Sequence, residues 1–234
     1  MTEGTQPILA LRGVTKLYRQ GSVEVQALRG LDLAVEAGEF TAVCGPSGSG
    51  KTTMLNLIGA LDRPSAGCVA LEGRDLAPLS RRELSRLRRD RIGFVFQAYN
   101  LLPILTAYEN AEMVLCLQGV DLDQRRKRVL GLLAEVGLEG LEDRRPDELS
   151  GGQQQRVAIA RAIASNPAVV LADEPTANVD SDTAENLLDI MEGLNRERGV
   201  TFLFSTHDPR VMARARRIVQ IVDGRVHRDE PQAP

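Results

Sequence analysis

Short apolar runs alternate along the chain with patterns of helical period, and this alternation is typical of an α/β protein. Runs bounded by glycine, proline or charge predict strands at 8–11, 31–35, 40–44, 68–71, 92–96, 168–172 and 201–205. Helices are predicted to start at 51, 81, 153 and 182 and to end near 59, 89, 163 and 198. A last hairpin is predicted at 218–222 and 225–227. We therefore expect a mostly parallel sheet covered by helices.

The middle of the chain differs from its two ends. From Thr106 to Glu148 the pattern is helical and contains no long strand. We expect a single domain over 1–234, in which 1–97 and 165–234 form the α/β core and 98–164 forms an inserted helical subdomain.

Composition limits the possible partners. The formal net charge of −3 over 234 residues gives no reason to expect a nucleic-acid partner. The arginine-rich segment 81–91 also contains Glu83 and Asp90, so a solvated face with local ion pairs is favoured over a surface for lipid or nucleic acid. No apolar run reaches the roughly 20 residues that a membrane helix needs, and the N-terminal pattern is unlike a secretory signal. We expect a cytosolic protein that contacts a membrane only through a partner.

The segment GPSGSGKTT follows a predicted strand and begins a predicted helix. This is the spacing of the glycine-rich loop that wraps nucleotide phosphates with backbone N–H groups. In that motif the lysine reaches the β- and γ-phosphates, and the next hydroxyl is a ligand of Mg²⁺. We therefore predict that ATP and Mg²⁺ bind at Gly45, Pro46, Ser47, Gly48, Ser49, Gly50, Lys51, Thr52 and Thr53.

Two adjacent carboxylates follow the strand predicted at 168–172. Because neighbouring side chains of an extended chain point to opposite sides, Asp173 and Glu174 are expected to have different roles. We assign Asp173 to the shell of Mg²⁺, directly or through a water molecule. We assign Glu174 to polarisation of the water that attacks the γ-phosphate. The alternative is an acidic surface turn before Pro175.

A second anion-binding helix start is predicted at LSGGQQQR, Leu149 to Arg156. The first turn of a helix carries unpaired N–H donors and a partial positive charge, and the glycine pair after Ser150 exposes the backbone. One nucleotide has one terminal phosphate, whereas this chain has two devices that would hold it. We therefore expect two copies of the chain to pair on ATP binding, so that each helix start completes the other copy's site. The residues of this start are Ser150, Gly151, Gly152 and Gln153.

Three further residues are candidates for the nucleotide site. Gln97 and His207 each follow a short apolar strand, and the carboxyl ends of parallel strands point into a ligand crevice. Gln97 offers an amide oxygen to Mg²⁺ or to the attacking water. His207 can donate to the γ-phosphate, or it can instead cap the next helix. Tyr18 follows the first predicted strand and can stack on adenine, or it can be an ordinary packing residue.

The order of these motifs along the chain is similar to that of a known protein family. The phosphate loop, Gln97, LSGGQQQR, VVLADE, Asp180 and His207 resemble, over nearly the whole chain, the nucleotide-binding subunits of ABC transporters. The resemblance implies an ATPase with a P-loop NTPase (RecA-like) core, an N-terminal antiparallel β subdomain and a helical subdomain that carries the LSGGQ motif. By this likeness Tyr18 stacks on adenine, and Gln97 lies in the loop that senses the membrane subunit. Ser150 and Gly152 contact the nucleotide of the opposite subunit, and Asp180 belongs to the segment that joins the two sites. Glu174 is the catalytic base and His207 the switch histidine.

A narrower likeness is carried by VQALRGLDL, GFVFQAYNLLP and LTAYEN, which resemble the lipoprotein-release and macrolide-export subgroup. It implies an integral-membrane permease as partner and a peripheral location on the inner face of the cell membrane. The helical lobe would dock a cytoplasmic helix of the permease, with 99–106 as an apolar lining. The alternative is a soluble ABC ATPase of a cytosolic complex in DNA repair, iron–sulfur assembly or cell division. The segment ANVD, 177–180, departs from the usual SALD or GNLD, which leaves the geometry between the two sites open.

Overall fold

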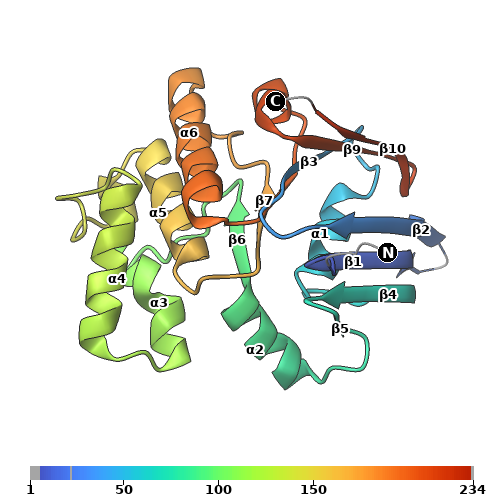
Figure 1. Cartoon of the computed structure of the whole chain (residues 1–234), viewed down its shortest axis with the longest axis horizontal. Helices are drawn as coiled ribbons and strands as arrows, with labels where there is room; N and C mark the ends of the chain where they lie inside the picture. The colour runs from blue at the N-terminus through green and yellow to red at the C-terminus, as the bar shows by residue number, and fades with distance from the viewer. Residues whose placement is uncertain (1–5, 22, 233–234) are drawn as a thin grey trace.

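The computed structural model describes residues 6–21 and 23–232, and its fold is α/β as the sequence predicted (Figure 1). The larger sheet has the order β10-β9-β3-β8-β7-β6, and every neighbouring pair in it is parallel except β10 and β9. Its central strands are almost completely buried, with Thr41 and Ser205 as buried polar residues, because helices cover both faces of the sheet. The strands are β3 (Phe40–Cys44), β6 (Ile92–Phe96), β7 (Val169–Asp173), β8 (Phe202–Ser205), β9 (Arg217–Val222) and β10 (Arg225–Pro231).

A second, antiparallel sheet has the order β2-β1-β4-β5. The expected strands 8–11 and 31–35 form only one end of a long hairpin. The rest of the hairpin was not predicted, because charged residues on its exposed face interrupt the apolar alternation. Gly13, with φ 58°, lies at a break in the pairing register between β1 and its neighbours. Tyr18 therefore lies within β1 and not after it. The strands are β1 (Leu9–Gln20), β2 (Val23–Val35), β4 (Ala66–Leu71) and β5 (Arg74–Asp75).

Helix α1 (Lys51–Ile58) lies between the two sheets (Figure 1). Its buried side chains share one apolar cluster with Leu9 and Leu28 of the antiparallel sheet and with Val43 and Leu171 of the parallel sheet. Burial of these apolar side chains, worth roughly 25 cal/mol per Å² of surface, therefore holds the start of α1 in place against both sheets.

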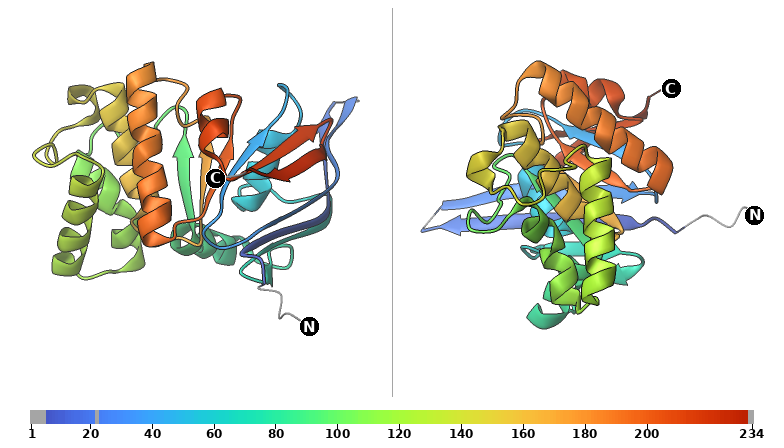
Figure 2. Two further views of the ribbon diagram at one scale, coloured as in Figure 1. Left: turned by 45° about the horizontal axis from the view of Figure 1, so that its top comes forward. Right: turned by 90° about the vertical axis from the view of Figure 1, so that its left-hand side faces the viewer.

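The stretch from Thr106 to Glu148 is helical, as predicted, and its helices lie together on one side of the larger sheet (Figure 2). One continuous apolar cluster joins Leu115 and Val129 of these helices to Val170 and Phe202 of the sheet. The boundaries at 98 and 164 therefore stay a prediction, because the helical part and the sheet share this core. The helices are α3 (Ala107–Gln118), α4 (Leu122–Glu135), the 3₁₀ turn η1 (Pro146–Glu148) and α5 (Gly151–Ile163).

Three other helices complete the fold, and two of them differ from expectation. Helix α2 (Arg81–Arg91) begins at the residue that the sequence predicted, after a capping box formed by Ser80 and Glu83. Helix α6 (Ser181–Arg198) starts earlier than expected, because Asp180 and not Asp182 accepts the backbone N–H at its first turn. Helix α7 (Pro209–Arg214) was not predicted, since six residues carry too little periodicity. None of the helices in 6–21 or 23–232 combines the length and apolar character needed to cross a membrane.

Candidate functional site

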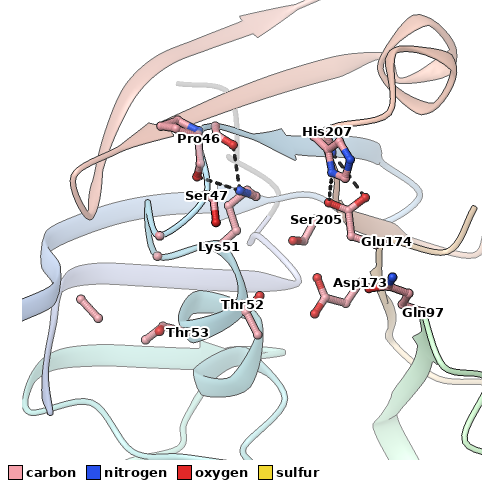
Figure 3. Close-up of a pocket in the computed structure, with 14 residues that line it drawn as sticks. Pro46, Ser47, Lys51, Thr52, Thr53, Gln97, Asp173, Glu174, Ser205 and His207 are labelled. Atoms are coloured by element: carbon pink, nitrogen blue, oxygen red, sulfur yellow. Dashed lines mark hydrogen bonds and ion pairs between the residues drawn. The ribbon is translucent and has the colours of Figure 1, made fainter. Parts of the chain in front are cut away.

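A pocket of about 670 Å³ opens where the ends of four parallel strands meet the start of α1 (Figure 3). It brings together residues that follow β3, β6, β7 and β8, which lie far apart in the sequence. Most of the predicted site residues line it, and Ala27 and Ser205 join them. The lining is Ala27, Gly45, Pro46, Ser47, Gly48, Gly50, Lys51, Thr52, Thr53, Gln97, Asp173, Glu174, Ser205 and His207.

The loop from Gly45 to Gly50 needs glycine for two separate reasons. Gly45 and Gly50 have φ values of 150° and 105°, which side-chain-bearing residues rarely adopt. A Cβ at Gly45 would also lie 2.0 Å from the carbonyl oxygen of Ile221, and one at Gly50 would lie 2.6 Å from that of Ala27. No side chain caps α1, so the backbone N–H groups of its first turn are available at the pocket to bind an anion.

Lys51 supplies a positive charge at the same place. Its Nζ atom donates to the carbonyl oxygens of Gly45 at 2.8 Å and Pro46 at 3.1 Å (Figure 3). Among the ion pairs of the described residues, none involves Lys51, so its charge is balanced by no carboxylate there. An ammonium held this way beside free N–H groups is suited to a phosphate.

Asp173 ends β7 and faces Thr52 across the pocket (Figure 3). Burial raises the pKa of Asp173, and the nearby Glu174 carboxylate adds to this shift, whereas the hydroxyls of Ser205 and Thr52 and the charge of Lys51 oppose it. A carboxylate and a hydroxyl are oxygen ligands that Mg²⁺ accepts, so these residues fit the ion. Within 6–21 and 23–232 no three His, Cys, Asp or Glu side chains gather as a metal cage. Mg²⁺ at this place would thus need phosphate and water oxygens as well.

Glu174 and His207 form a pair at the opposite wall. His207 Nδ1 lies 2.6 Å from Glu174 Oε1 (Figure 3). Thr206 Oγ1 donates to Glu174 Oε2 at 3.0 Å. Glu174 has φ 47°, a left-handed conformation that is uncommon for a residue with a side chain and often occurs at functional sites. The backbone N–H of His207 also donates to Glu174 Oε2, at 3.4 Å, so the carboxylate is held by its own backbone conformation, by Thr206 and by both the ring and the backbone of His207.

Gln97 lies beside this pair and contacts the loop that follows Glu174. Its Nε2 atom donates to Asn178 Oδ1 at 3.5 Å, and Asn178 Nδ2 donates to the carbonyl oxygen of Gln97 at 2.9 Å. Because the pair uses the amide nitrogen of Gln97, its amide oxygen stays available as an acceptor.

The start of α5 lies outside the pocket. Ser150 Oγ accepts from the N–H of Gln153 at 3.3 Å, and Gln153 Oε1 accepts from the N–H of Ser150 at 2.9 Å. This capping box was readable as S-x-x-Q but was missed by our sequence analysis. Gly152 is packed so tightly on α6 that a Cβ there would lie 2.3 Å from Thr183 Cγ2, and a Cβ at Gly151 would lie 2.7 Å from the hydroxyl oxygen of Tyr99.

Three other predicted residues also lie outside the pocket lining. Ser49 is buried in the phosphate loop, and its carbonyl accepts from Gly224 N at 3.0 Å. Asp180 is engaged as the cap of α6 through Thr183. Tyr18 is half-exposed, and its hydroxyl donates to Asp62 at 3.0 Å. Burial raises the pKa of Tyr18, and its neighbour Thr53, which does line the pocket, opposes this shift.

Some residues that support the site were not found from the sequence. Ser205 is the last residue of β8 and Thr206 follows it, and their signal was two adjacent hydroxyls at the end of an apolar strand. Gln155 is completely buried, and its Nε2 atom donates to the carbonyl oxygen of Pro175 at 2.7 Å. It ties α5 to the loop after Glu174, and its signal was one polar residue among the apolar positions of that helix.

The family model described as "ABC transporter" matches residues 28–177, a segment that includes the phosphate loop, Gln97, the start of α5 and Glu174. The chain belongs to the ABC transporter family. It is 50% identical to the lipoprotein-releasing system ATP-binding protein LolD of Anaeromyxobacter dehalogenans, over 96% of this chain and 95% of that protein. It is 46% identical to the macrolide export ATP-binding/permease protein MacB of Hyphomonas neptunium, over 96% of this chain. The chain spans about a third of the length of the MacB proteins that it matches, 31–35%.

Solved ABC structures share the fold. One is described as the dimeric structure of a post-hydrolysis state of the ATP-binding cassette MJ0796 bound to ADP and Pi. It matches with a TM-score of 0.88 and 45% identity over 97% of this chain and 99% of that chain. The protein of that name comes from Methanocaldococcus jannaschii and is called an uncharacterized ABC transporter ATP-binding protein. These matches confirm the expected P-loop cassette fold and the resemblance to the lipoprotein-release and macrolide-export subgroup.

Proposed function

We propose that the chain binds Mg–ATP in the pocket at the start of α1, hydrolyses it between two head-to-tail copies, and drives an integral-membrane permease. One observation carries the ATP site. Lys51 and the uncapped start of α1 present positive charge to one side of a pocket whose other side holds Asp173, Glu174 and His207. This pairing of an anion site with carboxylates suits a phosphate ester that is bound and then cleaved.

The residues of the pocket divide into binding and positioning roles. Backbone N–H groups of 45–53 wrap the phosphates, and Lys51 approaches the terminal ones. Thr52, Asp173 and the free amide oxygen of Gln97 hold Mg²⁺ directly or through water. Mg²⁺ bound there would neutralise phosphate charge that develops as the terminal bond breaks.

Glu174 acts on the attacking water. His207 contacts its Oε1 atom and Thr206 donates to its Oε2 atom, and these two contacts fix the orientation of the carboxylate at the pocket. Glu174 accepts a hydrogen bond from the water and orients its lone pair toward the terminal phosphate, a contribution typically worth ~10²–10⁴-fold in rate. His207, with 79% of its side chain exposed, is free to turn its other ring nitrogen to the same phosphate.

The two-copy arrangement follows from the place of α5. Ser150, Gly151, Gly152 and Gln153 form a helix start that does not line the chain's own pocket. The Ser150 hydroxyl oxygen accepts from Gln153, which leaves its hydrogen to donate to an anion outside the chain. A second copy in head-to-tail contact supplies that anion, and Asp180, at the start of α6 beside Gly152, lies in the segment between the two sites.

Glu174→Gln tests catalysis and pairing together. The variant should retain ATP, lose steady-state turnover by at least about a hundredfold, and elute as a dimer from a sizing column with Mg–ATP. Glu139→Gln, at an exposed glutamate far from the pocket in the sequence, is the matched control and should behave as wild type. Unchanged turnover in Glu174→Gln would refute the catalytic role, and a monomer under saturating ATP would refute the pairing.

A groove of about 390 Å³ between α2, β6, α3 and α5 is our candidate for the permease contact. Phe94, Phe96 and Met113 make it apolar, and three arginines line it. Of the 99–106 segment that we expected as lining, only Asn100 takes part, whereas Leu102 and Ile104 are exposed on the surface.

The charges of the groove favour one kind of occupant. Among the described residues Arg89 pairs with Asp90, whereas Arg88 and Arg161 donate to backbone carbonyls of Ala60, Asn100 and Tyr99. Burial lowers the pKa of Arg161, because its charge is poorly solvated there. A short helix with an apolar face and an acidic residue would fill the groove and compensate this charge. Such a helix from the permease would place the chain peripherally on the inner face of the membrane.

A single exposed leucine tests this contact. Leu61 lines the groove with 52% of its surface exposed, and Leu122 is 60% exposed on α4 at a different pocket. Leu61→Asp should abolish co-purification of a membrane protein from detergent extract and its stimulation of ATPase activity, with basal ATPase activity retained. Leu122→Asp should leave both intact. If neither wild type nor Leu122→Asp recovers a protein with membrane-spanning helices, a soluble ABC ATPase of a cytosolic complex becomes the better account.

A further inference from the structure

The loops after β7 and β8 are joined by a buried hydroxyl. Thr206 is completely buried, and its Oγ1 atom donates to Glu174 Oε2 at 3.0 Å. The same oxygen accepts from the backbone N–H of Asp208 at 2.9 Å. A backbone N–H can only donate, so the hydroxyl oxygen is the acceptor there and its single hydrogen is directed to Glu174.

A second bond holds the loop on the other side of Glu174. Thr176, which is 1% exposed, donates from Oγ1 to Asp208 Oδ2 at 2.7 Å. Between these two contacts the N–H of Glu174 donates to the carbonyl oxygen of Ser205 at 2.9 Å. The backbone N–H of His207 also donates to Glu174 Oε2, at 3.4 Å. Besides the contact of the His207 ring, four hydrogen bonds thus join the segments 174–176 and 205–208 around one carboxylate.

Glu174 needs such support because its conformation is strained. A left-handed φ on a residue other than glycine persists only where the surrounding structure holds it. His207 is the other side-chain partner of the carboxylate, but its own side chain is 79% exposed, so packing does not hold it in place. Thr206 is the partner that is fixed, since it is buried and β-branched.

We propose that Thr206 is a positioning residue that aims the Glu174 carboxylate at the attacking water, with Asp208 and Thr176 holding Thr206 in place. The inference rests on the proposed role of Glu174 as the catalytic base. Thr206 is completely buried and does not line the pocket, so it acts through one directed hydrogen bond. Loss of that bond leaves the carboxylate with the exposed His207 ring and the longer 3.4 Å hydrogen bond from the His207 backbone N–H, so it spends less time in its productive direction.

Thr206→Val and Thr206→Ser test the directed bond. Valine keeps the shape of threonine and removes the donor, whereas serine keeps the hydroxyl. We expect Thr206→Val to lower kcat about tenfold or more, with KM for ATP and the affinity for a fluorescent ATP analogue changed less than about twofold. Thr206→Ser should restore kcat to within about threefold of wild type. Thermal unfolding of all variants shows whether each is folded at the assay temperature.

A second background separates positioning of Glu174 from a general effect on the site. In Glu174→Gln the residual hydrolysis, followed in a single turnover with labelled ATP, should be the same with threonine or valine at position 206. Wild-type kcat in Thr206→Val overturns the proposal, as does equal slowing by Thr206→Ser or an equal loss in the Glu174→Gln background. High turnover in Glu174→Gln itself would instead refute the base role, so the two failures are distinguishable.

Discussion

Substitution of Gly152 by alanine tests how tightly the start of α5 is packed on α6. An added Cβ would lie 2.3 Å from Thr183 Cγ2, well inside van der Waals contact. Thr183 is not free to turn away, because its Oγ1 atom donates to Asp180 Oδ2 at 2.7 Å and its N–H donates to Asp180 Oδ1 at 2.9 Å.

Two opposing terms set the size of the effect. Alanine favours a helical position by about 1 kcal/mol over glycine. Overpacking of a rigid contact costs about 1–3 kcal/mol, and a 2.3 Å approach belongs at the upper end of that range. We therefore expect Gly152→Ala to lose about 1–2 kcal/mol of unfolding free energy, or about 2–4 °C in Tm for each kcal/mol.

Thr183→Ser is the matched second change. It removes the clashing Cγ2 and keeps the hydroxyl that bonds Asp180. The double variant should regain the lost stability, and the cycle should give a coupling of about 2–3 kcal/mol, the size of the overpacking term, in urea unfolding without nucleotide. Equal stability of Gly152→Ala and wild type, or no rescue by Thr183→Ser, would refute the packing argument.

The same pair of variants separates packing from nucleotide contact. If the start of α5 approaches the nucleotide of a second copy, the new methyl group remains in that contact after the packing is repaired. The double variant should then be as stable as wild type and still hydrolyse ATP about tenfold more slowly or worse. Restored turnover together with restored stability would mean that Gly152 serves packing alone.

Three further predictions concern stability. Arg214 joins α7 to Glu185, Asp189 and Glu192 of α6, so Arg214→Gln should lose about 1 kcal/mol at low salt and less at high salt, as measured by urea unfolding at both salt levels. Burial alone would raise the pKa of Asp208, but hydrogen bonds from Arg210 and Thr176 outweigh it and lower that pKa from 3.8 to about 2. The ionised Asp208 therefore stabilises the folded protein above about pH 4, and this stabilisation is lost as the pH falls toward 2. Thermal scans should therefore show a steeper loss of Tm over that range in wild type than in Asp208→Asn. Phe204 is completely buried against Phe40, so Phe204→Ala should cost about 3–5 kcal/mol in urea unfolding, and a loss under about 1 kcal/mol would contradict the packing.

The sequence predicted best those parts of the structure where only one residue type satisfies the local geometry. The phosphate loop was predictable because Gly45 and Gly50 sit where any Cβ would strike a carbonyl oxygen, and because Lys51 is followed by a hydroxyl. The central strands were predictable because they are short runs of mostly apolar residues without charge before their last position. The β1–β2 hairpin was underestimated, since Arg12, Lys16 and Arg19 interrupt the apolar alternation along β1.

The unpredicted contacts depend on distant partners. Gln155 and Pro175 meet only after α5 packs beside β6, and Thr183 reaches Gly152 only after α6 packs on α5. The capping role of Asp180 was within reach, because its Oδ1 atom bonds the N–H three residues later, and this spacing is visible in the sequence. The directed bond from Thr206 to Glu174 required the register of β7 against β8.

Head-to-tail pairing is tested most directly by the structure of Glu174→Gln with Mg–ATP. The account predicts that the terminal phosphate in each pocket lies within hydrogen-bonding distance of Ser150 from the other copy, about 2.7–3.2 Å. A nucleotide-loaded structure in which the start of α5 contacts no phosphate of a second copy would contradict it.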